Sequence, residues 1–238
     1  MSSNINIVLV NTSHPGNIGS TARAMKTMGF KKLTLVSPKE FPSDIANAKA
    51  VGCIDILETA KIVDTLDVSL ANSRLVVGLS ARSRKSNIPS LSIDELINVI
   101  SDFDDKEVSI VFGNEQSGLS NDDLQLCNYI VSIPTDDAYT SLNLASAVQI
   151  FCYEYFKSRK NNITPNIKSD IQYASNSTKN YMIQTFLSIM TNLEIITDKN
   201  KKSLAQNTHI IFNKLNLTHS EANLILGVLT SIQKALKK

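Results

Sequence analysis

The chain has 238 residues, of which 42% are hydrophobic and 19% charged, and its net charge is +2. This composition is typical of a globular protein with one large domain, or one domain and a small appendage. No apolar run is long enough to span a bilayer and the first residues do not form a signal peptide, so we expect a cytoplasmic protein without membrane contact.

The first two thirds of the chain alternate between short apolar runs and segments with helical periodicity. Turn residues separate them: His14-Pro15-Gly16-Asn17 opens one helix and Gly29 follows it. Ser92 and Glu95 have the spacing of a capping box. In chain order we predict a strand over 5–10, a helix over 17–28, a strand over 32–36, short helices over 43–49 and 66–70, a strand over 74–79, a helix over 92–100, a strand over 107–112, a short helix over 121–126, a strand over 129–133 and a long helix over 141–156.

The predicted strands are nearly continuous apolar runs rather than alternating ones. Such runs are typical of a mainly parallel sheet that is buried between two layers of helices. The predicted fold class is therefore α/β.

The composition changes after Lys157, where Ser, Asn and Pro replace most of the apolar residues. We expect one domain over 1–157, a linker over 158–176 and a small all-α extension over 177–238. Helices are predicted over 181–195, 204–215 and 218–237, the last with a capping box formed by Thr218 and Glu221. Three short helices bury little alone, so they should pack on one another, on the first domain or on a second subunit.

Charge is distributed unevenly along the chain. Residues 1–160 have a net charge of −3, and residues 161–238 have a net charge of +5. A basic appendage favours a nucleic-acid partner, although a solvated helical surface explains the same charge equally well. The three cysteines are scattered and the chain has no C-x-x-C pair, so we expect neither disulfides nor a metal site.

Two predicted strands lead into polar turns. The strand over 107–112 is followed by Gly113-Asn114-Glu115-x-x-Gly118, and the strand over 129–133 is followed by Ser141-Leu142-Asn143. Strand ends of an α/β sheet are where ligands usually bind, and glycines there let the backbone approach a ligand closely. A helix-capping turn would explain either segment alone, but the two together with Asn17 indicate a binding site.

The segment Asn17-Ile18-Gly19-Ser20-Thr21-Ala22-Arg23-Ala24 resembles motif 1 of the SPOUT RNA methyltransferases, and the two turns resemble motifs 2 and 3. Strings at 7–14, 22–29 and 76–84 are most similar to the bacterial TrmJ type, which 2′-O-methylates a tRNA cytidine or uridine at position 32 of the anticodon loop. The resemblance covers about residues 5–157. It implies a deep C-terminal trefoil knot in the domain, S-adenosylmethionine as cofactor, tRNA as substrate, and a homodimer with a shared active site.

The resemblance also implies site residues by position. The cofactor pocket would use Leu79, Ser80, Ala81, Gly113, Glu115, Ile133, Ser141 and Leu142. Leu79 replaces the small polar residue expected there, but a contact through its backbone would survive. Methyl transfer from a sulfonium donor requires mainly alignment, which suits a site with few titratable groups.

The implied catalytic residues are Arg23, Asn17, Ser141 and Asn143. A guanidinium stays protonated, so Arg23 is expected to grip a phosphate and stabilise developing alkoxide charge rather than act as a base. For the two asparagines the alternative is turn stabilisation, for Ser141 a helix N-cap, and for Glu115 a solvated carboxylate. Arg23, Arg82, Arg84 and Lys85 are the candidate RNA contacts.

Three other functions stay open at this point. A methyltransferase acting on ribosomal RNA or another tRNA site would share the same cofactor motifs. A non-catalytic RNA-binding module would keep the fold without the chemistry, and a small-molecule enzyme would not bind RNA. The chain has no P-loop and no complete dinucleotide fingerprint, so an NTPase and an NAD enzyme are disfavoured.

Overall fold

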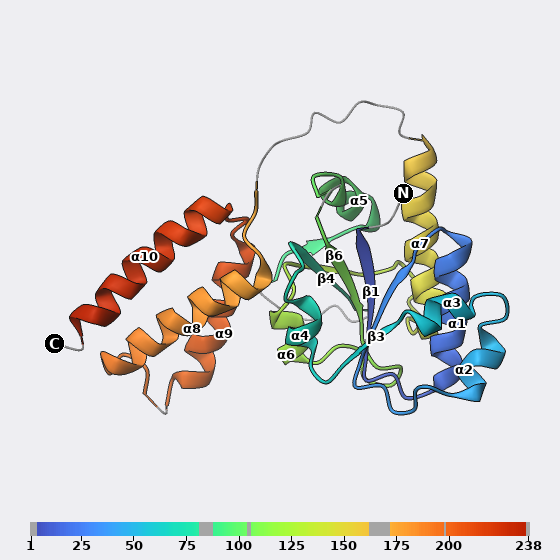
Figure 1. Ribbon diagram of the computed structural model, residues 1–238, viewed down its shortest axis with the longest axis horizontal. Coiled ribbons are helices and arrows are strands. Elements are labelled where there is room, and N and C mark those ends of the chain that lie inside the picture. Colours follow the sequence, from blue (N-terminus) through green and yellow to red (C-terminus); the bar gives the residue numbers. More distant parts are fainter. Residues whose placement is uncertain (1–3, 81–87, 104–105, 162–171, 198, 237–238) are drawn as a thin grey trace.

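Figure 1 shows the computed structural model, which describes residues 4–80, 88–103, 106–161, 172–197 and 199–236. The described residues form one seven-stranded sheet in which every pair of neighbouring strands is parallel. The strand order is β3-β2-β1-β6-β4-β7-β5. The strands are β1 (Ile5–Val10), β2 (Lys32–Val36), β3 (Lys61–Val63), β4 (Leu75–Leu79), β5 (Ser90–Leu91), β6 (Val108–Phe112) and β7 (Tyr129–Val131).

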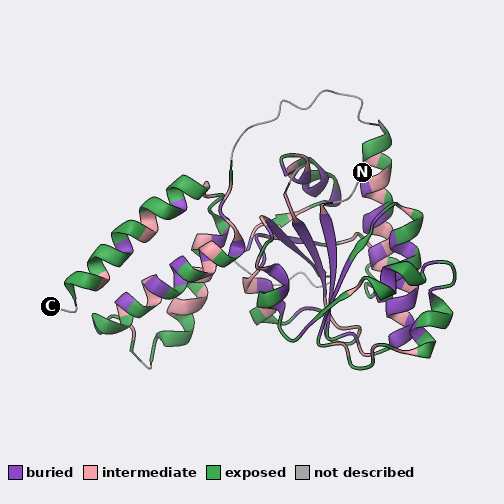
Figure 2. Cartoon of the chain, in the orientation of Figure 1, coloured by how far each residue is buried: buried purple, intermediate pink, exposed green. Residues whose placement is uncertain are grey.

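Helices cover both faces of this sheet, which confirms the predicted α/β class. On β1, Ile7 and Leu9 face one hydrophobic core, and Val8 and Val10 face the other, because successive side chains of a strand point to opposite faces. Figure 2 shows the strands buried between the two layers. The first layer holds α1 (Pro15–Thr27), α2 (Asp44–Lys49), α3 (Ile54–Glu58), α5 (Ile93–Ser101) and α7 (Leu144–Asn161), and the second holds α4 (Leu66–Leu70) and α6 (Asn121–Gln125).

The predicted elements lie close to those observed. The runs over 5–10, 32–36 and 66–70 are reproduced to the residue. The capping box of Ser92 and Glu95 is formed, with the Ser92 hydroxyl accepting from the Glu95 backbone N–H. The sequence analysis missed α3, β3 and β5, which have two to five residues each and are too short to show a periodic pattern.

The long helix α7 begins later than predicted. The Asn143 Oδ1 accepts hydrogen bonds from the backbone N–H groups of Ala145 (3.0 Å) and Ser146 (3.4 Å). Asn143 therefore caps the helix, and the alternative in which Ser141 is the N-cap is wrong. This leaves Ser141 and Leu142 in the irregular segment before the helix. The implied trefoil knot depends on the path of residues 81–87, which lie outside the described part of the chain.

Three further helices form what we call the helical tail: α8 (Asn176–Asn192), α9 (Lys201–Lys214) and α10 (His219–Ala235). They pack around Met182, Ile189 and Leu229. The capping box of Thr218 and Glu221 opens α10 as predicted. Helix α8 begins five residues before the predicted start because Ser175 caps it and its first turn is polar, which hides the helical periodicity.

The helical tail lies beside α4 and α6 (Figure 1). Polar side chains hold it there: the Asn128 Nδ2 donates to the Asn213 carbonyl (2.8 Å), and the Asn213 Nδ2 donates to the Gln125 carbonyl. On α8, the Asn180 Nδ2 donates to the Asp67 carboxylate (3.0 Å). Of the packing alternatives left open by the sequence, the structure shows the helices contacting both one another and the α/β layers.

Candidate functional site

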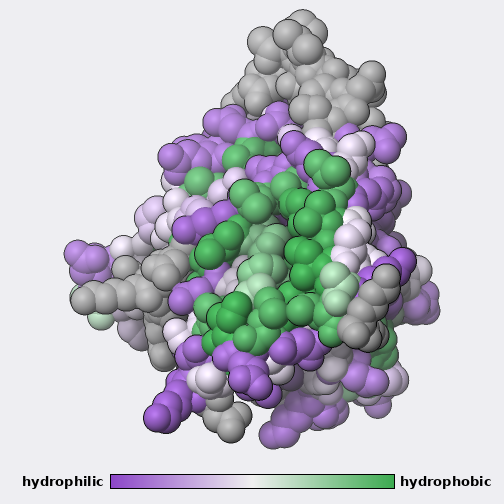
Figure 3. Space-filling model, turned by 90° about the vertical axis from the view of Figure 1, so that its left-hand side faces the viewer, coloured by the Kyte–Doolittle hydropathy of each residue, from purple (hydrophilic) through white to green (hydrophobic). Residues whose placement is uncertain are grey.

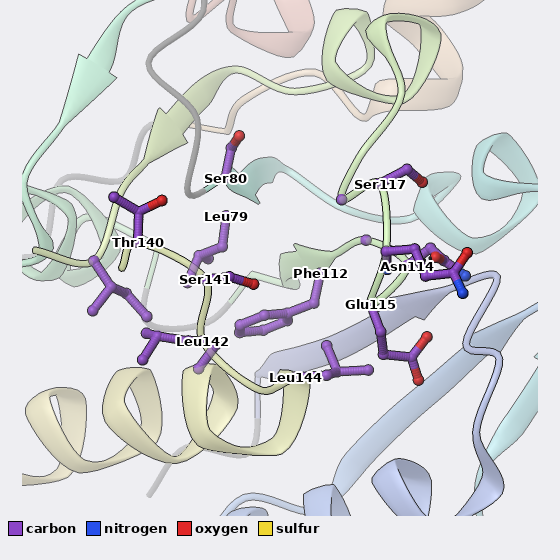
Figure 4. Close-up of a pocket in the computed structure, with 15 residues that line it drawn as sticks. Leu79, Ser80, Phe112, Asn114, Glu115, Ser117, Thr140, Ser141, Leu142 and Leu144 are labelled. Carbon is purple, nitrogen blue, oxygen red and sulfur yellow. Dashed lines mark hydrogen bonds between the residues drawn. The ribbon is translucent and has the colours of Figure 1, made fainter. Parts of the chain in front are cut away.

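A cavity of about 260 Å³ lies at the carboxyl ends of β4, β6 and β7. Figure 4 shows Leu79, Phe112, Ser141 and Leu142 gathered around it, from β4, β6 and the segment before α7. The strand order places β6 between β1 and β4, so segments distant in sequence meet at this edge. The full lining is Leu79, Ser80, Phe112, Gly113, Asn114, Glu115, Gln116, Ser117, Gly118, Ile133, Thr140, Ser141, Leu142, Leu144 and Ala147.

The cavity contains most of the residues proposed for the cofactor. Seven of the eight line it: Leu79, Ser80, Gly113, Glu115, Ile133, Ser141 and Leu142. Ala81 lies outside the described residues, as do the candidate RNA contacts Arg82, Arg84 and Lys85.

The loop after β6 folds back tightly on itself. A Cβ atom added at Gly113 would lie 2.1 Å from the Gly118 carbonyl carbon and 2.2 Å from the Leu119 nitrogen, so only glycine fits there. Gly118 adopts a φ of 68°, in the left-handed region that favours glycine. Asn114 closes the loop, because its carbonyl accepts from the Gly118 N–H (2.8 Å) while its Nδ2 donates to the Asn11 carbonyl (2.6 Å).

The Glu115 carboxylate joins this loop to the segment after β1. Its Oε2 accepts from the backbone N–H (2.9 Å) and the hydroxyl (2.8 Å) of Ser13, and its Oε1 accepts from the Asn17 Nδ2 (2.8 Å). Partial burial opposes ionisation, but the hydrogen bonds from Asn17 and Ser13 outweigh it and lower the pKa of Glu115 to about 2. Glu115 is thus a fixed carboxylate that holds backbone and side-chain N–H groups, and the alternative of a solvated carboxylate is wrong.

Asn17 and Asn143 complete this connection. The Asn143 Nδ2 donates to the Asn17 Oδ1 over 3.1 Å, while the Asn143 Oδ1 caps α7. Both ends of the Asn17 amide are therefore occupied, one by Glu115 and the other by Asn143. The segments after β1, β6 and β7 are held together by this Glu115–Asn17–Asn143 chain of hydrogen bonds.

Arg23 is not part of that chain of bonds. It is exposed on α1, and within the described residues no hydrogen bond or ion pair involves its guanidinium. Arg23 is six positions after Asn17, so on a helix the two side chains leave the axis about 120° apart. Within one subunit Arg23 consequently projects away from the side of α1 that bears Asn17.

Sequence reasoning singled out Gly118 for close approach of the backbone, and it missed seven other lining residues: Phe112, Asn114, Gln116, Ser117, Thr140, Leu144 and Ala147. Four of these seven lie within or next to the quoted motif 2 string, so the whole length of that string was the available signal. His14 lies in the turn before α1, as predicted from the sequence. The His14 backbone N–H donates to Glu115 (3.3 Å), and its Nδ1 caps α1 by accepting from the Gly16 N–H (3.0 Å).

The described part of the cavity wall carries little charge. Apolar side chains alternate with hydroxyl groups and loop backbone around it, and Glu115 is the charged residue among those that line it. No lysine or arginine lines the wall as far as the structure describes it. Cys53, Cys127 and Cys152 are free and buried, as expected for small apolar residues. In the described part of the chain, His, Cys, Asp and Glu form no group of three suited to a metal ion, and no helix could cross a membrane.

Comparisons with known proteins agree with this architecture. A family model described as the SpoU rRNA Methylase family matches residues 4–153. The chain is 40% identical over 236 residues to the tRNA (cytidine/uridine-2′-O-)-methyltransferase TrmJ of Yersinia pestis, which covers 97% of this chain and 92% of that protein. It is 36% identical to the tRNA (cytidine/uridine/adenosine-2′-O-)-methyltransferase TrmJ of Pseudomonas aeruginosa, covering 98% and 95%.

A solved structure shares both the sheet and the helical tail. The crystal structure of TrmJ from Z. mobilis ZM4 superposes with a TM-score of 0.86 at 26% identity. That match covers 96% of this chain and 98% of the other. The agreement therefore extends beyond the residues that the family model matches.

Proposed function

The chain belongs to the SpoU methylase family, and we propose that it transfers a methyl group to the 2′-hydroxyl of a tRNA ribose. The target is a cytidine or uridine at position 32 of the anticodon loop. The observation that carries this proposal is the cavity at the ends of β4, β6 and β7, in a chain similar along nearly its full length to tRNA 2′-O-methyltransferases. A tRNA substrate also implies a cytoplasmic location.

S-adenosylmethionine is the proposed cofactor, and it supplies an electrophilic methyl group on a sulfonium. The residues present fit it. The tight turn at Gly113 brings the backbone to the cavity wall. Exposed backbone N–H and C=O groups there can form hydrogen bonds with the edge of an adenine ring. Leu79, Ile133 and Leu142 offer apolar contacts, and the described part of the wall, which contains Glu115 and no cation, suits a positively charged ligand.

Four residues of this chain are proposed to act on the RNA substrate or to position the residues that do. Ser141, on the cavity wall, is proposed to hydrogen-bond the target ribose. Arg23 is proposed to grip an RNA phosphate and stabilise the alkoxide as charge develops on the 2′-oxygen. Asn17 and Asn143, whose side chains already bond each other, are proposed to be positioning residues that hold these segments in register.

We also propose that the enzyme is a homodimer with shared sites. Arg23 is exposed and leaves α1 away from Asn17, so it is free to reach the cavity of a second subunit. Mixed dimers test this: one subunit carries Arg23→Ala and the other carries Gly113→Ala. A shared site predicts that activity returns on mixing two inactive variants, because one cavity is then complete. A site within one subunit predicts no recovery.

Ribosomal RNA is the second candidate substrate, since the family description names it. The favoured substrate is tRNA because the similar tRNA enzymes match the helical tail as well as the sheet. Labelled methyl transfer to unmodified tRNA and to ribosomal RNA, compared side by side, separates the two. Transfer to tRNA alone is expected. Transfer to ribosomal RNA alone would replace the substrate, and cofactor binding without transfer to either would indicate an RNA-binding module.

A further inference from the structure

Helix α6 connects the cavity to the helical tail. Its start adjoins the cavity, because Gly118 lines the wall and Ser120 caps the helix by accepting from the Asp123 N–H (3.1 Å). Its end contacts the tail, because the Asn213 Nδ2 of α9 donates to the Gln125 carbonyl. A helix of little more than one turn therefore lies between the cavity wall and a hydrogen bond made by the tail.

The same helix packs tightly on β4, whose end forms another part of the cavity. A Cβ atom added at Gly78 would lie 3.0 Å from the Leu119 Cδ1 and 3.0 Å from the Cys127 Sγ. The Leu124 Cδ2 would be 3.2 Å away, and all three side chains are buried. Gly78 is followed by Leu79, which lines the cavity. Because a close-packed contact has no space to absorb a shift, movement of α6 would displace both the loop and the end of β4.

A buried asparagine joins the end of α6 to β4 and to the tail. The Asn128 backbone N–H donates to the Val76 carbonyl (2.8 Å), and its Oδ1 accepts from the Val76 N–H (2.8 Å). The Asn128 Nδ2 donates to the Asn213 carbonyl (2.8 Å). Asn128 and Asn213 are 2% and 5% exposed, so breaking these bonds would leave buried polar groups unpaired. The position of α9 against α6 is therefore closely specified.

Apolar contacts alone would not specify this position. Ile210 of α9 packs against the core that contains Leu119 and Leu124, but the burial of apolar surface has no direction. Figure 3 shows that the helical tail also carries hydrophobic side chains on the side that faces away from the sheet. Hydrogen bonds depend on direction, so the bonds of Asn213 determine how α9 meets α6.

A second polar contact joins the tail to a helix that does not lead to the cavity. The Asn180 Nδ2 of α8 donates to the Asp67 carboxylate of α4 (3.0 Å). Helix α4 contacts β2 and β3, and none of the described residues that line the cavity belongs to it. The two asparagines therefore separate docking of the tail in general from support of α6 in particular.

We propose that Asn213 is a positioning residue for the cofactor site. By fixing the end of α6, it holds the loop over 113–119 in the shape that binds the cofactor. The proposal rests on the function proposed above, because it takes the ligand of the cavity to be S-adenosylmethionine. It makes the helical tail a support of the cofactor site, although none of the described lining residues comes from the tail.

Cofactor affinity tests this role with two matched substitutions. Asn213→Ala removes the bond to Gln125, and Asn180→Ala removes the bond to Asp67. In calorimetric titrations with S-adenosylmethionine, Asn213→Ala should raise the Kd about tenfold, as expected if the free energy of one hydrogen bond acts on the loop. Asn180→Ala should keep the wild-type Kd. A raised KM for tRNA in both variants with an unchanged Kd for the cofactor would assign Asn213 to docking of the tail alone, and would overturn the proposal.

Hydrogen exchange in the absence of cofactor tests the loop itself. The Gly118 N–H donates to the Asn114 carbonyl (2.8 Å), so its exchange rate, measured by NMR, reports whether the loop is closed. Asn213→Ala should speed exchange at Gly118 while the N–H groups of β1 stay protected, and Asn180→Ala should leave Gly118 at the wild-type rate. Wild-type exchange at Gly118 in Asn213→Ala would refute the positioning role. If the wild type bound no S-adenosylmethionine, the proposed cofactor would be wrong, and exchange at Gly118 would still decide the role of Asn213.

Discussion

The side chains of Asn17 and Asn143 are 126 positions apart in the chain and are joined by a 3.1 Å hydrogen bond. Asn17 stands in the first turn of α1 and Asn143 caps α7, so this bond links the starts of two helices. Glu115 holds the other end of Asn17. Three segments that are far apart in the sequence are thus joined beside the cavity, and each link can be tested.

Glu115→Gln should destabilise the protein. Four hydrogen atoms point at the carboxylate, from Ser13, His14 and Asn17, and a glutamine would turn an NH₂ group toward some of these donors. We expect a loss of about 1–3 kcal/mol in the free energy of unfolding, measured in urea, together with slower methyl transfer. Glu107→Gln is the control, since its ion pair with Lys32 is on the surface and should contribute under about 1 kcal/mol. Equal effects of the two variants would contradict the proposed role of Glu115.

Asn143→Asp and Asn143→Ala separate the two functions of Asn143. Aspartate keeps an oxygen for the Ala145 N–H but cannot donate to Asn17, whereas alanine loses both bonds. The alanine variant should lose about 1 kcal/mol of stability, the aspartate variant less, and both should transfer methyl groups slowly. If Asn143→Asp kept full activity, the bond to Asn17 would not matter for the reaction.

Gly113→Ala should abolish cofactor binding while most of the sheet stays folded. The added methyl group meets the Gly118 backbone, so the loop after β6 must open and lose its shape at the cavity wall. Gly118→Asn is the control in the same loop, because no atom lies within 4 Å of its Cβ and asparagine tolerates positive φ. Calorimetric titration with S-adenosylmethionine should show binding by the control only. If Gly113→Ala bound the cofactor with wild-type affinity, the tight turn at Gly113 would not be needed for cofactor binding.

Lys179→Met should stabilise the protein at neutral pH. Lys179 is 1% exposed on α8, and burial, together with nearby Arg74, lowers the pKa of its ammonium to about 8. Between pH 8 and the ordinary value of 10.5 the unfolded chain binds more protons, so the free energy of unfolding of the wild type should rise with pH.

The methionine variant should lack this rise and be more stable at pH 7 by on the order of 1–3 kcal/mol. Urea titrations across this pH window measure both effects. Lys214→Met, at the exposed end of α9, should show neither. A less stable Lys179→Met would mean that the buried ammonium is well compensated.

The sheet was predictable because its strands are apolar runs whose length and burial leave one assignment, as for residues 5–10. Likewise, the cavity was predictable from the rule that ligands bind where parallel strands end, which places Gly113 and Ser141 together. The hydrogen-bond partners of Asn17 were not predictable, because nothing local in the sequence specifies a contact with residues about a hundred or more positions away. The packed side of α10 was not predictable either, since the pattern shows which residues are apolar but not which of them α8 covers.

The most direct test of the proposed function maps the methyl group. Wild type and Arg23→Ala are each incubated with labelled S-adenosylmethionine and unmodified tRNA, and the product is digested and analysed by mass spectrometry. We expect a 2′-O-methylated cytidine or uridine at position 32 with the wild type, and little or none with Arg23→Ala. A methyl group on a base, or no transfer to tRNA by a protein that binds the cofactor, would contradict the proposal.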